Sequence, residues 1–163
     1  MFFPIETLMQ VCRAEDEDAE LLELYLDSAI DFAQSYCNRK FFEDADDMLI
    51  QQSTVSSDIR AAIAEYDDTV KTLNGDNTVS DAQFSELVRL AKRTRDKKLD
   101  EAHRTSAGMV FTPAIKQAVL LLVGHLYYNR ESVVVTQGIV AAQVPLTSTD
   151  ILDRYIYLGA NRL

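Results

Sequence analysis

The sequence predicts an all-α protein: a compact helical bundle around one buried helix in the C-terminal half, with an inserted antiparallel helical hairpin and a short extended, β-like loop. Two observations predict this class. Glycine and proline number only 5 and 3 in 163 residues, so few positions interrupt a helix. Apolar residues make up 47% of the chain and recur at helical spacing, as a packed helical core requires. We treat residues 1–163 as a single domain in which residues 56–106 form an inserted arm.

The N-terminal part predicts two helices, from Ile5 to Cys12 and from about Ala19 to Cys37. Acidic residues at 15–18 suit the start of the second helix, because carboxylates there complement the helix dipole. This helix has one apolar face and, on the opposite side, an acidic stripe made of Glu20, Glu23, Asp27 and Asp31. The stripe is either ordinary solvated surface or a charged surface that faces a partner or a channel. Leu24, an apolar residue within the stripe, favours an interface.

Residues 38–55 are predicted to be a solvated linker, since their carboxylates lack the glycine and the closing glutamate of a calcium loop. The segment from Asp58 to His103 is predicted to be a helical hairpin. Residues 74–77 supply its turn, and Ser80 with Gln83 supplies a capping box for the return helix. The apolar seam of the first helix is expected at Ile59, Ile63, Tyr66, Val70 and Leu73.

The return helix of the arm holds the one basic cluster of the sequence, formed by Arg89, Lys92, Arg93, Arg95, Lys97 and Lys98. Acidic residues are interleaved with it, which favours a solvated, salt-bridged helix. The alternative is a surface that docks onto an acidic partner or onto DNA. No aromatic residues alternate with these cations, as a single-strand binding platform would need.

The strongest helix signal follows Gly108. Thr112 is a good N-cap and Pro113 suits the first helical position. The next residues are apolar around nearly the whole circumference, which predicts a helix buried on all sides, and Gly124 would permit close approach of a neighbour. Residues 132–144 predict an extended hairpin or ordered loop that pairs with another subunit. A last helix is predicted after a cap at residues 147–149, bearing Ile151, Leu152, Tyr155 and Leu158.

The sequence contains no catalytic constellation. Its two histidines are far apart, its glycines are isolated, and its carboxylates lie in solvated runs where nothing would raise their pKa for acid catalysis. We therefore expect no enzymatic activity, no cofactor and no metal site. The formal charge of −10 opposes sequence-independent binding of nucleic acid. No apolar run is long enough to cross a bilayer, and we expect synthesis in the cytoplasm.

Two stretches share a pattern with a known family. Residues 113–131 read Pro-x-x-Lys-Gln-Ala, an apolar run, and His-Leu-Tyr-Tyr-Asn-Arg-Glu, and the N-terminal helices end Tyr-Cys-Asn-Arg at Arg39. This pattern resembles the head–tail connector (adaptor, or head-completion) proteins of long-tailed bacteriophages and prophages. The arm between the two stretches is longer than the family leads one to expect. The residues of the motif are Pro113, Gln117, His125, Tyr128, Asn129, Arg130 and Glu131.

The resemblance implies a virion protein at the head–tail junction. Such connectors form a ring, commonly twelvefold, which docks beneath the portal protein, extends the DNA channel and receives the tail-completion or stopper protein. DNA would pass without specific binding, and an acidic wall that repels phosphate suits this passage. We therefore expect the acidic stripe on the lumen or rim of the ring. We expect a subunit or portal interface at Val133, Val134, Val135, Ile139, Val140 and Val144.

Two other classes of function stay open at this point. A helical regulatory or scaffolding protein would use the arm as a coiled-coil site for a partner. A nucleic-acid module would use the basic half of the arm.

Overall fold

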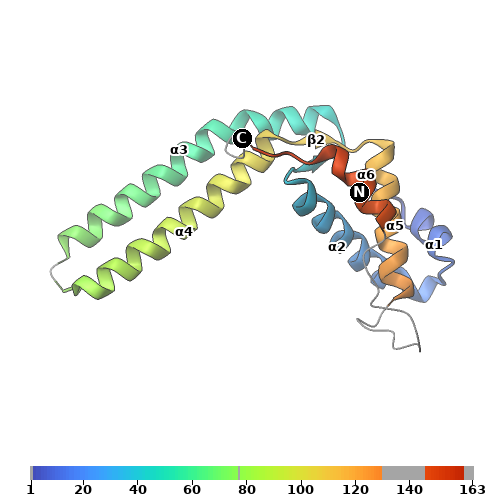
Figure 1. Cartoon of the computed structure of the whole chain (residues 1–163), viewed down its shortest axis with the longest axis horizontal. Helices are drawn as coiled ribbons and strands as arrows, with labels where there is room; N and C mark the ends of the chain where they lie inside the picture. Colours follow the sequence, from blue (N-terminus) through green and yellow to red (C-terminus); the bar gives the residue numbers. More distant parts are fainter. Residues whose placement is uncertain (1, 77, 130–145, 160–163) are drawn as a thin grey trace. The chain divides into compact units, whose positions relative to one another are not determined.

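The computed structural model describes residues 2–76, 78–129 and 146–159, and it confirms the all-α class (Figure 1). The chain divides into two compact units, unit 1 (Met1–Asp44 and Met109–Leu163) and unit 2 (Ala45–Gly108). We call unit 2 the arm. The elements of the described part are α1 (Ile5–Cys12), the 3-10 helix η1 (Asp16–Asp18), α2 (Ala19–Cys37), β1 (Phe41–Phe42), α3 (Ala45–Gly75), α4 (Asp81–Ser106), β2 (Met109–Val110), α5 (Pro113–Tyr128), α6 (Leu146–Leu152) and the 3-10 helix η2 (Asp153–Tyr155).

In unit 1, α5 is the element against which α1, α2 and α6 pack. Its start is as the sequence predicts, because the Thr112 hydroxyl accepts a hydrogen bond from the Ile115 amide and Pro113 follows the cap. Both N-terminal helices end on a left-handed residue, Arg13 and Asn38. The buried core contributed by the helices is Leu8, Cys12, Leu22, Leu26, Ala29, Ile30, Ala33, Cys37, Ile115, Ala118, Val119, Leu122, Val123 and Leu152.

The prediction that α5 is buried on all sides is wrong. Leu121 is 37% exposed and Tyr128 is 62% exposed, so α5 has one buried face and one open face. Gly124 lies on the open side, and a Cβ added there would meet no described atom within 4 Å. The close helix approach expected at Gly124 is therefore not made within the described part of the chain. Apolar composition indicated the central helix but not which of its faces the other helices cover.

A short parallel strand pair, which no sequence pattern predicted, joins the two segments of unit 1 that flank the arm. Phe41 pairs with Met109 and Phe42 with Val110. The Met109 amide donates to the Lys40 carbonyl at 3.0 Å, and the Phe111 amide donates to the Phe42 carbonyl at 2.9 Å. Beside this pair, the Phe111 ring contacts the rings of Phe2, Phe3 and Phe41. The pair therefore connects the part of unit 1 that precedes the arm with the part that follows it.

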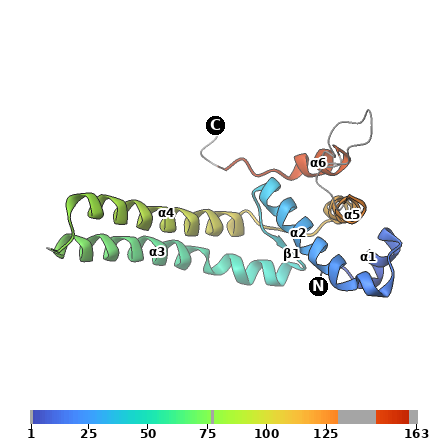
Figure 2. The same cartoon turned by 90° about the horizontal axis from the view of Figure 1, so that it is seen from below.

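The arm is a hairpin of two long helices, α3 and α4, which lie side by side in both views (Figures 1 and 2). The capping box is present, since Ser80 accepts from the Gln83 amide and the Gln83 side chain accepts from the Ser80 amide. The linker predicted at residues 38–55 is wrong, because α3 already begins at Ala45. Asp46 and Asp47 lie in its first turn, where carboxylates stabilise a helix.

The apolar seam between the arm helices differs from the prediction at one position, where Ala62 takes the place expected for Ile63. Ala62 is buried, whereas Ile63 is 42% exposed. Val55 is also buried, and Tyr66, Val70 and Leu73 are half-buried. The regular spacing of four and three favoured the larger Ile63, but the small Ala62 lets the two helices approach more closely.

The last helical segment starts earlier than predicted, at Leu146, and continues from α6 into η2 at Asp153. Leu152 is fully buried, whereas Leu158 lies beyond the helices and is 61% exposed. The expected loop at residues 132–144 lies outside the described residues. The assignment of residues 1–163 to a single connector domain stays a prediction.

Candidate functional site

The acidic stripe lies along the exposed side of α2. Leu22, Leu26 and Ala29 point into the core, so the positions opposite them on the helix face solvent. Glu20, Glu23, Asp27 and Asp31 are all exposed, and Leu24, which is 60% exposed, lies among them. The structure therefore brings the four predicted carboxylates together on one surface of unit 1. Their role stays a prediction.

This surface carries only one sign of charge. The sequence has no lysine or arginine between Arg13 and Arg39. None of the four stripe carboxylates forms an ion pair or a side-chain hydrogen bond with any residue that the structure describes. Carboxylates arranged in this way repel a phosphate backbone and attract a basic surface.

The C-terminal segment is anchored on the end of α2 by several hydrogen bonds. The Tyr36 hydroxyl donates to Asp153 at 2.6 Å, and the Tyr157 amide donates to the Cys37 carbonyl at 2.8 Å. The Asn38 side chain donates to the Tyr157 carbonyl at 3.3 Å, and the Arg39 guanidinium lies 5.4 Å from the centre of the Tyr157 ring. The hydrogen bond to Asp153 raises the pKa of Tyr36, because it favours the protonated phenol. These contacts attach the C-terminal segment to the C-terminal end of α2, the helix that carries the acidic stripe.

Burial raises the pKa of Cys37 to about 11 and also raises that of Cys12, so both thiols are poor nucleophiles in the folded protein. In the unfolded chain Cys37 loses its proton at the ordinary pKa of 9.0, whereas in the folded chain it keeps the proton until about 11. The stability that this proton contributes is thus complete below pH 9.0 and is lost as the pH rises to about 11.

We therefore expect the urea midpoint of the wild-type protein to fall more steeply over that alkaline range than the midpoint of Cys37→Ala. Circular dichroism at each pH measures both midpoints. Equal pH slopes in the two proteins would contradict the assignment of the alkaline loss to Cys37.

The described motif residues lie on α5 and at its end, but they do not converge on one site. Pro113 and Gln117 are exposed near the start of the helix. At the other end, the Asn129 side-chain nitrogen lies 3.2 Å from His125 Nδ1 and donates to the His125 carbonyl at 2.9 Å. This arrangement closes the end of the helix and is structural rather than chemical. Arg130 and Glu131 lie outside the described residues.

Two tyrosines at the end of α5 form hydrogen bonds with the N-terminal elements, and no sequence pattern predicted these contacts. The Tyr127 hydroxyl donates to Asp18 at 2.5 Å, and the Tyr128 hydroxyl donates to the Cys12 carbonyl at 2.7 Å. Each pair is separated by more than 100 residues in sequence, so no local pattern could have indicated it. These bonds join the end of α1 and the 3-10 helix that precedes α2 to the central helix of unit 1.

The described residues contain no group of three or more histidines, cysteines and carboxylates placed to hold a metal ion. None of the described helices has both the length and the apolar character of a membrane span.

Comparison with protein families gives a match to part of the chain. Residues 7–69, less than half of the chain, match the family described as phage gp6-like head-tail connector protein. This match supports a phage head–tail connector family. It also supports a structural connector role for the chain. Neither curated proteins nor solved structures provide a match.

The matched segment runs from α1 through α2 and β1 into α3. It contains all four carboxylates of the acidic stripe, and it ends before α5, so the motif at residues 113–131 stays a resemblance. The comparison thus applies directly to most of α1, to α2 and β1, and to most of α3.

Proposed function

We propose that the protein forms the ring-shaped connector, or adaptor, at the head–tail junction of a phage particle, with twelve copies in the virion. The ring docks beneath the portal protein, extends the DNA channel and receives the tail-completion or stopper protein. The family match over residues 7–69 carries this proposal. The protein acts as a structural part and needs no bound cofactor for this role.

The acidic stripe supports the proposed contact with moving DNA. A DNA-binding surface neutralises phosphates with lysine and arginine, and each neutralised phosphate adds to affinity. The exposed face of α2 does the opposite, since it presents four carboxylates and no cation. Placed on the lumen or rim of the ring, this face keeps DNA from adhering to the wall while it passes.

The test of this placement is charge reversal in the phage that encodes the protein. A variant with Glu20, Glu23, Asp27 and Asp31 changed to lysine should still form rings with the portal but should package less DNA and release fewer infectious particles. The matched control changes four exposed arm carboxylates, Asp67, Asp68, Asp100 and Glu101, to lysine, which alters the net charge equally. Normal packaging and phage yield in the stripe variant would discard the lumen or rim placement.

Ring assembly is tested separately. We propose that residues 132–144, with their valines and Ile139, contact the adjacent subunit or the portal. Electron microscopy of the protein mixed with its portal should show rings, and deletion of these residues should leave a folded protein that forms none. Rings formed by the deletion variant would refute the interface. A wild-type protein that neither forms rings nor binds the portal would refute the connector role and favour a regulatory protein with a coiled-coil arm.

A further inference from the structure

The outer part of the arm lacks a buried core. The buried residues of α3 and α4 are Val55, Ala62, Ala102 and Thr105, which all belong to the part of the arm away from its turn. Between Ile63 and Glu101, none of the described residues is buried. Two helices alone cover only one face of each other, and a stable helical layer normally packs against a second layer. The outer arm therefore lacks the layer that would cover its seam.

An apolar groove runs along this uncovered part of the arm. It has a volume of about 260 Å³ and follows three turns of each helix, between residues 62–73 of α3 and residues 87–98 of α4. Leu87 and Leu90 are 40% and 58% exposed at its edge. We call this surface the arm groove; its apolar lining is Ala62, Tyr66, Leu73, Leu87, Leu90 and Ala91.

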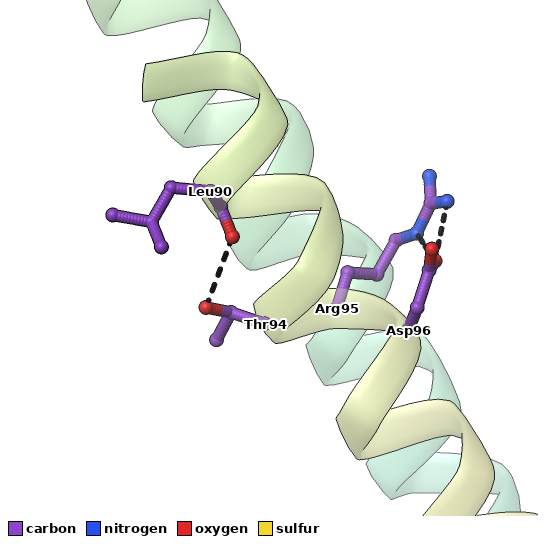
Figure 3. Close-up of polar contacts among 4 residues, drawn as sticks. All are labelled: Leu90, Thr94, Arg95 and Asp96. Carbon is purple, nitrogen blue, oxygen red and sulfur yellow. Dashed lines mark hydrogen bonds and ion pairs between the residues drawn. The ribbon is translucent and has the colours of Figure 1, made fainter. Parts of the chain in front are cut away.

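The polar residues that line the arm groove already have partners within the arm. The Thr69 hydroxyl donates to the Glu65 carbonyl, and the Thr94 hydroxyl donates to the Leu90 carbonyl at 3.2 Å (Figure 3). Lys98 forms an ion pair with Glu65 across the two helices. These residues therefore leave no unpaired charge to bind a small polar ligand. The groove instead fits an apolar surface.

Arg95 also lines the groove and is likewise engaged. Its guanidinium donates to Asp96 at 2.7 Å and lies 4.6 Å from the centre of the Tyr66 ring. In Figure 3, Leu90 and Thr94 project from one side of α4, and Arg95 and Asp96 project from the other. Leu90 is therefore free to contact a second molecule while the charged pair stays within the arm.

We propose that the arm groove binds the arm groove of a second copy of this chain, so that two hairpins form a four-helix bundle. A two-fold arrangement places each copy's Leu87 and Leu90 over the apolar lining of the other, which supplies the missing layer to both arms at once. An identical partner also explains why the same face has both a hollow and protruding leucines.

The charges of the two helices select one of the two possible two-fold arrangements. Residues 87–98 of α4 contain one carboxylate, Asp96, and six basic residues: Arg89, Lys92, Arg93, Arg95, Lys97 and Lys98. Residues 62–73 of α3 contain Lys71 and three carboxylates: Glu65, Asp67 and Asp68. A two-fold axis across the helices would stack α4 on α4 and oppose the basic stretches. An axis along the helices stacks α3 on the partner's α4, with both turns at the same end, so that the net-basic stretch of each copy lies beside the net-acidic stretch of the other.

Sedimentation of the full-length protein without portal tests the pairing. Wild-type protein should form a dimer, and the double variant L87S/L90S should weaken the dimer by tenfold or more because it removes apolar surface from both sides of the interface. The control L49S/I63S changes two arm residues of matched exposure, 60% and 42%, that do not line the groove. It should dimerise like the wild type. Circular dichroism verifies that both variants keep their helices.

Engineered cysteines test the arrangement. Thr69 and Thr94 each lie one helical turn beyond the Glu65–Lys98 pair towards the turn of the hairpin, so they lie at the same height on α3 and α4. In the proposed arrangement, T69C of one copy meets T94C of the other. A mixture of the two single variants should therefore form a disulfide-linked dimer under mild oxidation, and either variant alone should form far less. The native Cys12 and Cys37 are buried.

The outcomes separate this inference from the proposed connector role. A wild-type protein that stays monomeric at about 100 µM, or an L87S/L90S variant that dimerises like the wild type, overturns the pairing. If T69C alone or T94C alone forms as much disulfide-linked dimer as the mixture of the two, the proposed arrangement is wrong. The dimer is measured without portal and the ring with portal, so a dimer without rings refutes only the connector role, and rings without a dimer refute only the pairing.

Discussion

Val119→Asp is expected to destabilise unit 1 strongly. Val119 is fully buried on α5, among the core residues that α1, α2 and α6 cover. An aspartate there either buries a charge without a partner or forces the helix out of the core, at a cost of about 4 kcal/mol or more. Domains of this size are stable by about 5–15 kcal/mol, so this single change removes a large part of the margin.

Hydrogen exchange measured by mass spectrometry tests this expectation, because it follows α2 and α5 separately from the arm. Peptides from both helices should lose protection in Val119→Asp. The control is Gln117→Asp, which places the same side chain at an exposed position two residues earlier on the same helix. Wild-type protection of α5 in Val119→Asp would show that this helix is not the centre of the core.

Phe111→Ala is expected to cost about 3–5 kcal/mol of unfolding free energy. The Phe111 ring lies 4.5 Å from that of Phe2, 6.0 Å from that of Phe3 and 5.3 Å from that of Phe41. Its removal leaves a cavity among three other rings, next to the strand pair.

Urea unfolding followed by circular dichroism measures this cost. Phe111→Leu keeps most of the apolar volume and should lose less than half as much. If the two variants are equally stable, the ring contacts of Phe111 do not contribute to the stability of unit 1.

Local patterns in the sequence were sufficient for the helices whose ends are set by nearby residues. The bounds of α1 and α2, the Thr112 cap and the Ser80 capping box all depend on residues within one turn of the helix end. The exposure of the acidic stripe followed in the same way, because helical spacing alone separates it from the buried face.

Features that depend on distant contacts were missed. The strand pair involves only two residues on each side and joins Phe41 to Met109, so it has no detectable period in the sequence. The hydrogen bond from Tyr127 to Asp18 is equally distant. The open face of α5 was missed for a related reason, since apolar residues around a helix indicate burial without showing how many neighbours are present to cover it.

The strand pair of β1 and β2 has a consequence for how the length of the arm can vary. The Met109 amide donates to the Lys40 carbonyl, so the two segments of unit 1 that flank the 64-residue arm are held side by side. The arm is therefore an insertion between two segments of unit 1 that the strand pair joins. Helical turns can be added to or removed from both helices at the turn of the hairpin without changing a core residue of unit 1, because no residue of that core lies in the arm. Arm length is thus a dimension along which such proteins can diverge while the bundle stays constant.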